Sequence, residues 1–270
     1  MPEISPSDHQ PARPLFRELE RSHALVTALF DGCATARLFV DDSAAPQAGV
    51  IVCNSRVLCA GDASQTGFLN EMTRTFSDDL IPAHLARGKD AYLVYAFGEA
   101  WDTALQNLFP TYELYQGTRQ YYEITDFAPR PDLHLPDGFS MQRITPEFLS
   151  SNVAGLNAVR EEMCSERASV EDFLARSFGL CPVHSDEIAG WCMSEYNVGD
   201  RCEIGIATLE KHQRQGIATL TTWYFLAEAF RRGYTRVGWD CWTRNVPSVA
   251  TARKTGFTLM EEYPAVVVEL

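Results

Sequence analysis

The chain has 270 residues, of which 46% are hydrophobic and 22% charged, and its formal net charge at pH 7 is -13. That length suffices for one large domain or two small ones, and no apolar run approaches the roughly 18 residues of a membrane span. So acidic a surface repels phosphate backbones, which excludes nucleic acid as an expected partner. The charge favours solubility first and cationic small molecules second.

The start of the chain and the cysteines indicate where the protein works. Residues 1–14, MPEISPSDHQPARP, have neither an apolar core nor a basic start, so we expect a flexible tail and not a signal peptide. The eight cysteines include no C-x-x-C pair, and several lie in apolar, strand-like runs. They predict a protein of the reducing cytoplasm, with no disulfide and no structural metal.

The first half of the chain predicts one helix and then strands that alternate with helices. Apolar residues between Leu15 and Phe30 recur at helical spacing, and Asn54–Ser55 predicts a hairpin turn. The expected strands are 34–42, 49–61, 90–97 and 119–127, and further helical segments are expected at 63–87 and 100–108.

A proline-rich stretch, APRPDLHLPDG, follows at residues 128–138. Three prolines within eight residues break any helix and favour extended backbone. We therefore expect a linker at 129–138, which separates an N-terminal domain at 15–128 from a second domain at 139–270.

The second half predicts an α/β fold with a mixed sheet, because consecutive strands are followed by single helical crossovers. Ser169 is expected to cap a helix whose third residue is Asp172. Pro247 and Gly256 mark the first turn and the end of a later helix. The expected strands are 139–145, 178–185, 187–196, 202–209, 236–242 and 265–270, and the clearest helices are 219–233 and 245–256.

The stretch QRQGIAT, residues 213–219, joins a strand to a helix. Such a turn exposes backbone N–H groups at the positive end of a helix, which together form an anion site. Gly216 lets the backbone approach a ligand closely, Ala218 keeps the next site small, and Arg214 and Thr219 add donors. The expected ligand is a diphosphate; the alternative is a plain helix start behind a solvated loop.

This stretch, Q-R-Q-G-I-A, matches the [QR]-x-x-G-x-[GA] signature of the GNAT N-acetyltransferase superfamily, which binds the pyrophosphate of coenzyme A. The flanking order of elements and the K-x-G-F ending at Lys254–Phe257 match as well, so residues 139–270 resemble a GNAT domain. The segment from Glu203 to Phe257 resembles the branch of the zwittermicin A resistance acetyltransferase. This resemblance implies a mixed, mostly antiparallel sheet flanked by helices, with a degenerate GNAT-like N-terminal domain.

The resemblance also implies a set of cofactor contacts with acetyl-CoA as co-substrate. Ala207 and Thr208 would pair their backbone with the pantetheine amides, because a splayed sheet offers an unpaired strand edge. Asn245 and Ser248 would contact the pantetheine arm or the substrate side; the alternatives are a helix N-cap and an exposed first-turn serine. The pyrophosphate would lie on Gln213, Arg214, Gln215, Gly216, Ile217, Ala218 and Thr219.

Direct attack of an amine on a thioester requires a base, and Glu203 is the first candidate. By strand alternation it shares a face with Gly205 and Ala207. Asp240 on the next strand is a second candidate, which could instead position a cationic substrate or cap the sheet edge. Glu195 is a third.

The sequence departs from the family where many members have a tyrosine that protonates the leaving thiolate. Ala252 stands at that position. Cys241, Tyr263 and water are the remaining general acids, although Cys241 lies in an apolar strand where a core role is the simpler interpretation.

The resemblance therefore implies an acetyltransferase that moves acetyl from acetyl-CoA to a primary amine of a small molecule by direct attack in a ternary complex. The acidic charge favours a cationic amine, such as an aminopolyol or aminoglycoside-like metabolite. Another acyl donor, a protein amine as acceptor, and a non-catalytic protein that binds acyl-CoA are the alternatives. The N-terminal half could line the acceptor pocket, mediate homodimer formation or only stabilise the fold.

Overall fold

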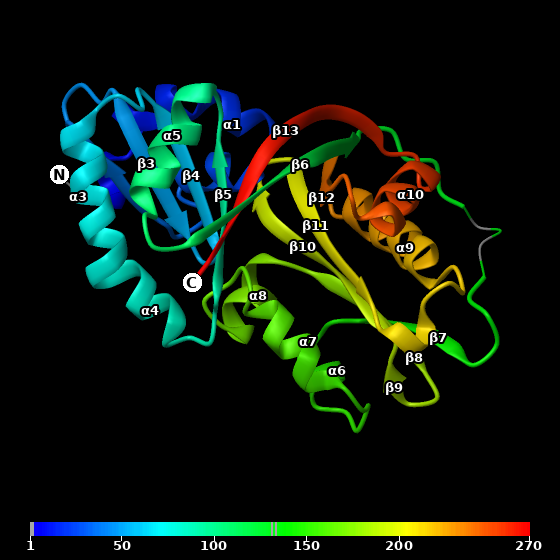
Figure 1. Cartoon of the computed structure of the whole chain (residues 1–270). Helices are drawn as coiled ribbons and strands as arrows, with labels where there is room; N and C mark the ends of the chain where they lie inside the picture. Colours follow the sequence, from blue (N-terminus) through cyan, green and yellow to red (C-terminus); the bar gives the residue numbers. More distant parts are fainter. Residues whose placement is uncertain (1–2, 131, 133) are drawn as a thin grey trace. The chain divides into compact units, whose positions relative to one another are not determined.

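The computed structural model describes residues 3–130, 132 and 134–270 (Figure 1). Internal contacts divide the chain into two compact units, Met1–Arg119 with Glu262–Leu270, and Gln120–Glu261. The expected linker at 129–138 lies inside the second unit, and residues 131 and 133 of it lie outside the described residues. No helix among the described residues is long and apolar enough to cross a membrane.

The sheet of the first unit is mostly antiparallel. Its only parallel neighbours among the described pairs are β4 and β5, and the turn at Asn54–Ser55 joins β3 to β4 as predicted, with Cys53 paired to Arg56. The strands, in spatial order, are β1 (Glu3–Ile4), β2 (Arg37–Val40), β3 (Ala48–Cys53), β4 (Arg56–Gly61), β5 (Ala91–Ala96) and the end of β13 (Thr258–Glu269).

Helices cover this sheet and bury its apolar side chains. One cluster joins α3 and α5 to alternate residues of the strands, such as Val50, Val57 and Val94. The helix expected over 15–30 is broken, because the backbone of His23 is extended. The helical segments are Gln10–Phe16, α1 (Arg17–Ser22), α2 (Ala24–Phe30), α3 (Thr66–Thr75), a π-helical turn at Phe76–Leu80, α4 (Ile81–Leu85) and α5 (Glu99–Leu108).

The flexible tail expected at residues 1–14 is a wrong prediction from Glu3 onward. Ile4 is buried, and β1 pairs with Leu38 and Phe39 of β2. The ring of His9 lies 3.1 Å from the carbonyl oxygen of Ile4, and Arg37 forms an ion pair with Glu3 at 2.8 Å. Ile4, His9 and Ala12 are all buried, so this segment packs on the first unit although most of its residues are polar or proline.

The second unit contains a mixed sheet in which β11 and β12 run parallel. The pairs β10–β11, β8–β10 and β7–β8 are antiparallel, so the sheet is mostly antiparallel as expected. The strands, in spatial order, are the end of β6 (Glu113–Ile124), β12 (Arg236–Trp242), β11 (Arg201–Thr208), β10 (Gly190–Val198), β8 (Gly179–His184) and β7 (Phe139–Arg143), with β9 (Glu187–Ile188) beside β8.

Helices lie on both faces of this second sheet (Figure 1). One face packs on α9 (Ile217–Arg231) and α10 (Val246–Lys254), and the other packs on α6 (Pro146–Leu149), α7 (Leu156–Met163) and α8 (Val170–Arg176). Ser169 caps α8 as predicted, since its Oγ accepts a hydrogen bond from the backbone N–H of Asp172 at 3.2 Å.

The two units repeat one order of elements. In the first, β3, β4, the helical segment from α3 to α4, β5, α5 and β6 occur in this order, and β10, β11, α9, β12, α10 and β13 occur in the same order later in the chain, with a 3-10 turn at Glu210–His212 before α9. The parallel pair is β4–β5 in the first unit and β11–β12 in the second. The two halves thus share an order of elements, while the GNAT-like origin of the N-terminal half stays a prediction.

Candidate functional site

Strands β11 and β12 separate part of the way along their length. They pair at Arg201–Arg236, Cys202–Val237 and Glu203–Gly238, and no further pair joins them among the described residues. On its other side β11 stays paired with β10 up to Thr208. The edge of β11 from Ile204 to Thr208 therefore faces an opening between the strands, which we call the strand gap.

The turn after β11 leaves the start of α9 uncapped. Gly216 is the N-cap residue, has a left-handed φ of 79° and contributes no side-chain hydrogen bond, whereas Thr145, Ser169 and Asn245 cap α6, α8 and α10 with theirs. Arg214 is also left-handed, with φ of 60°, and its side chain is exposed. Turns of this kind direct successive N–H groups to one side, and the first N–H groups of a helix have no partner within it.

The two glutamines of the turn brace its backbone. Gln213 Nε2 donates to the carbonyl oxygen of Thr208 at 3.0 Å, and Gln215 Nε2 donates to that of Lys211 at 3.1 Å. In this structure both amides thus hold the turn together, which leaves the backbone N–H groups and the exposed side chain of Arg214 to face a ligand.

The two faces of β11 differ in chemistry. Ile204 packs with α9 in one apolar cluster, while Ala207 packs with α7 and α8 in the other. Because side chains alternate along a strand, Glu203 and Gly205 point to the same side as Ala207, as the sequence predicted.

Glu203 belongs to a buried chain of hydrogen bonds at the narrow end of the strand gap. Arg201 Nη2 donates to Glu203 Oε1 at 3.0 Å and to Tyr121 Oη at 3.2 Å. The Tyr121 hydroxyl donates to Glu123 Oε2 at 3.1 Å, and Arg236 Nη2 donates to the same oxygen at 2.7 Å. We call these five residues the vertex network.

Four of the five residues of the vertex network are buried, and Arg236 is exposed. Arg201, Glu203, Tyr121 and Glu123 are exposed by only 5%, 6%, 2% and 8%. Burial, together with the charge of Glu203, raises the pKa of Tyr121 well above its usual value, so its hydroxyl keeps its proton. A Cβ built on Gly238 would lie 2.8 Å from Tyr121 Oη and 2.9 Å from Glu203 Cγ, which places both groups where β11 and β12 part.

Further carboxylates surround Gly205, the next residue of β11 on this face. A Cβ on Gly205 would overlap Oε1 of Glu195, which stands opposite Glu203 in the register of β10 and β11. The same Cβ would lie 3.8 Å from Oε1 of Glu162, a residue of α7. Acidic groups therefore gather on the face that Glu203 shares.

The remaining predicted contacts lie on β12 and α10. Asp240 is half-buried on β12, two residues beyond Gly238 and on the same face by alternation. Asn245 Oδ1 accepts from the backbone N–H of Ser248 at 3.2 Å as an N-cap, and Ser248 Oγ accepts from Trp239 Nε1 at 3.0 Å. Both side chains thus have structural partners beside the roles that the resemblance implies.

The candidate general acids Cys241 and Tyr263, and Ala252 at the position where many relatives have tyrosine, lie elsewhere. Cys241 and Ala252 are both in the buried cluster under α9, and Tyr263 belongs to the first unit, where its ring contacts those of His23 and Tyr95. Sequence reasoning missed Arg201, Tyr121 and Glu162. The spacing R-x-E at 201–203 in an otherwise apolar strand was the one local signal, since residues two apart share a strand face.

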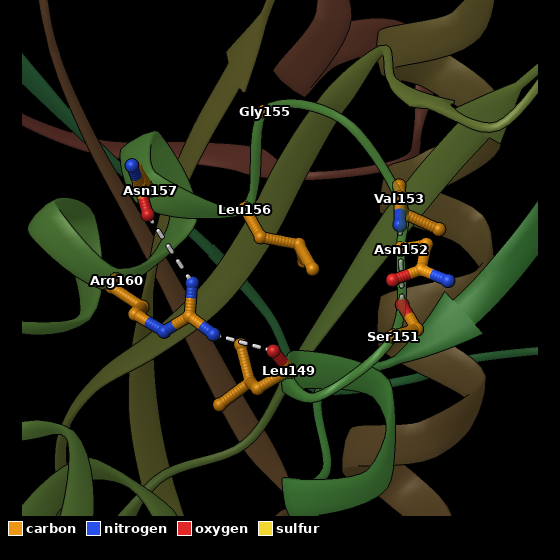
Figure 2. A pocket seen from close by; sticks show the side chains of 8 residues that line it. All are labelled: Leu149, Ser151, Asn152, Val153, Gly155, Leu156, Asn157 and Arg160. Carbon is orange, nitrogen blue, oxygen red and sulfur yellow. Dashed lines mark hydrogen bonds between the residues drawn. The ribbon is translucent and has the colours of Figure 1, made fainter.

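A pocket of about 340 Å³ lies at the loop between α6 and α7, and Figure 2 shows the residues that line it. Arg160 Nη1 donates to Asn157 Oδ1 at 3.4 Å, and Nη2 donates to the carbonyl oxygen of Leu149. None of the predicted site residues is among those that line it, so the pocket supports none of their roles.

Known proteins resemble this chain along almost all of its length. The family model described as GNAT acetyltransferase matches residues 13–266. A curated relative from Bacillus subtilis, described as the uncharacterized N-acetyltransferase YdfB, is 25% identical over 239 residues that cover 88% of this chain and 87% of its own.

Solved structures share the fold at low sequence identity. A GCN5-related N-acetyltransferase-like protein from Streptococcus suis has a TM-score of 0.68 and 19% identity, over 94% of this chain and 98% of its own. A GCN5-related N-acetyltransferase from Sphaerobacter thermophilus has a TM-score of 0.61 and 15% identity, over 99% and 94%. A tandem GNAT protein from the clavulanic acid biosynthesis pathway has a TM-score of 0.56 and 12% identity, over 99% and 97%.

Proposed function

Because the chain belongs to the GNAT acetyltransferase family, we propose that it transfers the acetyl group of acetyl-CoA to a primary amine of a small molecule, by direct attack in a ternary complex. Its place in the zwittermicin A resistance branch is part of the same proposal. The observation that carries it is that the strand gap opens directly before the uncapped start of α9.

Each part of acetyl-CoA has a suitable partner in this arrangement. The backbone N–H groups from Gln215 to Thr219 suit a pyrophosphate, because they are grouped at the positive end of a helix of 15 residues. The edge of β11 from Ile204 to Thr208 offers backbone donors and acceptors to the pantetheine amides. The thioester then lies toward the narrow end of the gap, beside Glu203.

The chemistry follows from that placement. The amine nitrogen attacks the thioester carbon, a backbone N–H on the edge of β11 stabilises the oxyanion, and the thiolate of coenzyme A leaves. Glu203 takes the proton that the nitrogen loses. Since Ala252 cannot donate a proton, we assign no side chain as general acid.

The acceptor is a cationic amine. Glu195 and Glu162 lie around Gly205 on the face of Glu203, and Asp240 shares that face. Carboxylates in a partly buried site attract an ammonium group and reject an anionic acceptor.

Calorimetric titration with acetyl-CoA tests the cofactor site, using the natural protein and two matched valine variants. Gly216→Val and Gly233→Val lie at opposite ends of α9, both at left-handed backbone (φ of 79° and 93°), and both with open space where the Cβ would go. They therefore introduce a similar backbone strain. We expect Gly216→Val to weaken binding by about 100-fold through lost charge-assisted hydrogen bonds, and Gly233→Val to bind normally.

Equal affinity of the natural protein and Gly216→Val would remove the turn from the proposal. Release of free thiol in the presence of small polycationic amines, but not of lysine peptides, identifies a small-molecule acceptor. Binding of acetyl-CoA without thiol release for any amine would favour the non-catalytic alternative.

A further inference from the structure

We infer that Arg201 is a positioning residue that holds the carboxylate of Glu203 at the narrow end of the strand gap and balances its charge. The inference depends on the proposed acetyl transfer, with Glu203 as base. It concerns a residue that does not itself touch the reacting atoms.

One nitrogen atom of the Arg201 guanidinium donates hydrogen bonds to two acceptors. Its Nη2 lies 3.0 Å from Glu203 Oε1 and 3.2 Å from Tyr121 Oη. Arg201 and Glu203 are two residues apart on β11, so the strand itself keeps their side chains on one face. The guanidinium also lies over the ring of Tyr121, 5.5 Å from its centroid.

Tyr121 is in turn held in place by residues of β6 and β12. Its hydroxyl donates to Glu123 Oε2, and Arg236 of β12 donates to that same oxygen. The vertex network therefore joins β6, β11 and β12 at the last pair before the gap, Glu203–Gly238. A carboxylate tied in this way cannot swing away from the point at which the strands separate.

The charges of the vertex network balance only while Glu203 is ionised. Arg201 and Arg236 are then matched by Glu203 and Glu123, and buried charges are tolerated when they are paired. Three further carboxylates lie on this face, Glu195 on β10, Glu162 on α7 and Asp240 on β12, and alternation along β6 puts the buried Arg119 on the same face as Tyr121. Without Arg201 these carboxylates would favour a protonated Glu203, which is no longer a base.

The same balance suits the proton transfer. During attack an N–H bond of the amine breaks and an O–H bond forms at Glu203, which leaves the vertex network with one excess positive charge. That excess favours release of the proton to solvent, so Glu203 returns to its ionised form after each turnover.

A double-mutant cycle between Arg201 and Glu203 tests the inference. Acetyl transfer is measured at saturating acetyl-CoA and amine for the natural protein, Arg201→Gln, Glu203→Gln and the double variant. Loss of a general base costs about 100-fold in kcat, and misplacing it costs a similar order. We expect at least a tenfold loss for Arg201→Gln in the natural background, and less than a twofold further loss in the Glu203→Gln background.

Two measurements tell whether Arg201 positions Glu203 or only stabilises the fold. In Arg201→Gln the acidic limb of kcat/KM should move to higher pH, while KM for acetyl-CoA stays within about twofold of the natural value. Arg201→Lys, which keeps the charge, should restore the natural pH profile and part of kcat.

Arg201→Gln leaves Glu203 buried without its cation, so the single variant is open to misfolding; thermal unfolding is measured for every variant. Tyr121→Phe provides a second route, because it removes the shared hydroxyl and no charge. It should lower kcat several-fold in the natural background and have no effect in the Glu203→Gln background.

An equal loss from Arg201→Gln, or from Tyr121→Phe, in both backgrounds overturns the inference. Unchanged turnover of Glu203→Gln beside an active natural protein also overturns the inference about Arg201. That outcome leaves the proposed acetyl transfer itself standing. A natural protein that neither binds acetyl-CoA nor acetylates any amine overturns the proposed function and this inference with it.

Discussion

Gly205 illustrates how one absent side chain arranges a group of charges. The carboxylate of Glu195 lies directly over its backbone, in the space that a Cβ would fill. The clash falls on the end of a flexible side chain, so the fold can absorb a small addition while the carboxylate moves.

Gly205→Ala should therefore change the acceptor site more than the stability. We expect the free energy of unfolding to fall by less than about 1 kcal/mol, and KM for a cationic amine to rise several-fold because Glu195 is displaced. Steady-state kinetics with each substrate varied in turn, together with urea unfolding, measure both. Glu195→Gln is the matched control, since it removes the charge and leaves Gly205 untouched. A rise in KM for acetyl-CoA alone would contradict the role of Glu195 in the acceptor site.

Single residues were predictable from the sequence where the signal is local. The cap at Ser169 follows from spacing along the chain, and the structure confirms it. The face of Glu203 follows from strand alternation. Tyr121 was not predictable in this way, because it lies 80 residues from Arg201 and nothing local says which strand borders β12. The roles of Asn245 and Ser248 stay predictions.

At the scale of the element, α9 is anchored at its far end by a cluster around Glu228. This buried carboxylate accepts from Arg231 at 2.6 Å, from Arg232 at 2.8 Å and from Arg143 of β7 at 3.1 Å. Hydrogen bonds from Arg231 and Arg232 outweigh burial and lower its pKa to about 2. The helix that presents the cofactor turn is thus tied to the sheet by charge as well as by apolar packing.

Glu228→Gln should destabilise the protein by about 1–2 kcal/mol at pH 7. This is less than the full pKa shift would give, because the arginines around Glu228 are largely exposed and solvent screens their charges. The folded-state pKa lies below the ordinary one, so this stabilisation is complete above about pH 4.5 and disappears as the pH falls toward 2. Urea unfolding of both proteins between pH 7 and pH 3 measures it. Glu161→Gln, at an exposed site on α7, is the control and should show no such pH-dependent difference. If the difference in free energy of unfolding between the natural protein and Glu228→Gln stays constant with pH, the charge cluster is not its cause.

Elements with a regular pattern were predicted within a few residues, and those with exposed, irregular ends were not. The helix expected at 219–233 is α9 at Ile217–Arg231, and the strand expected at 236–242 is β12. Strands β6 and β13 are both 12 residues long and begin well before their expected starts at 119 and 265, because their first residues are mostly exposed and do not alternate between polar and apolar. Alternation of polar and apolar residues cannot reveal a strand whose sides both face water.

At the scale of the whole molecule, the repeated order of elements was visible in the sequence, but the division between the units was not. The chain passes from one unit to the other between residues 119 and 120 and again between residues 261 and 262. These two boundaries lie inside β6 and β13, and no change of composition marks either of them. Proline marks backbone that cannot be helical, which is not the same as a boundary between packed cores.

The parallel strand pairs of the two units have a consequence for stoichiometry. In the first unit β4 and β5 stay paired up to Cys59–Ala96, the last residue of β5, whereas β12 continues four residues beyond its last pair with β11. Backbone groups that bond each other cannot also bond a pantetheine chain. Calorimetry should therefore count one acetyl-CoA for each chain, and a value of two would show that the first unit also binds acetyl-CoA.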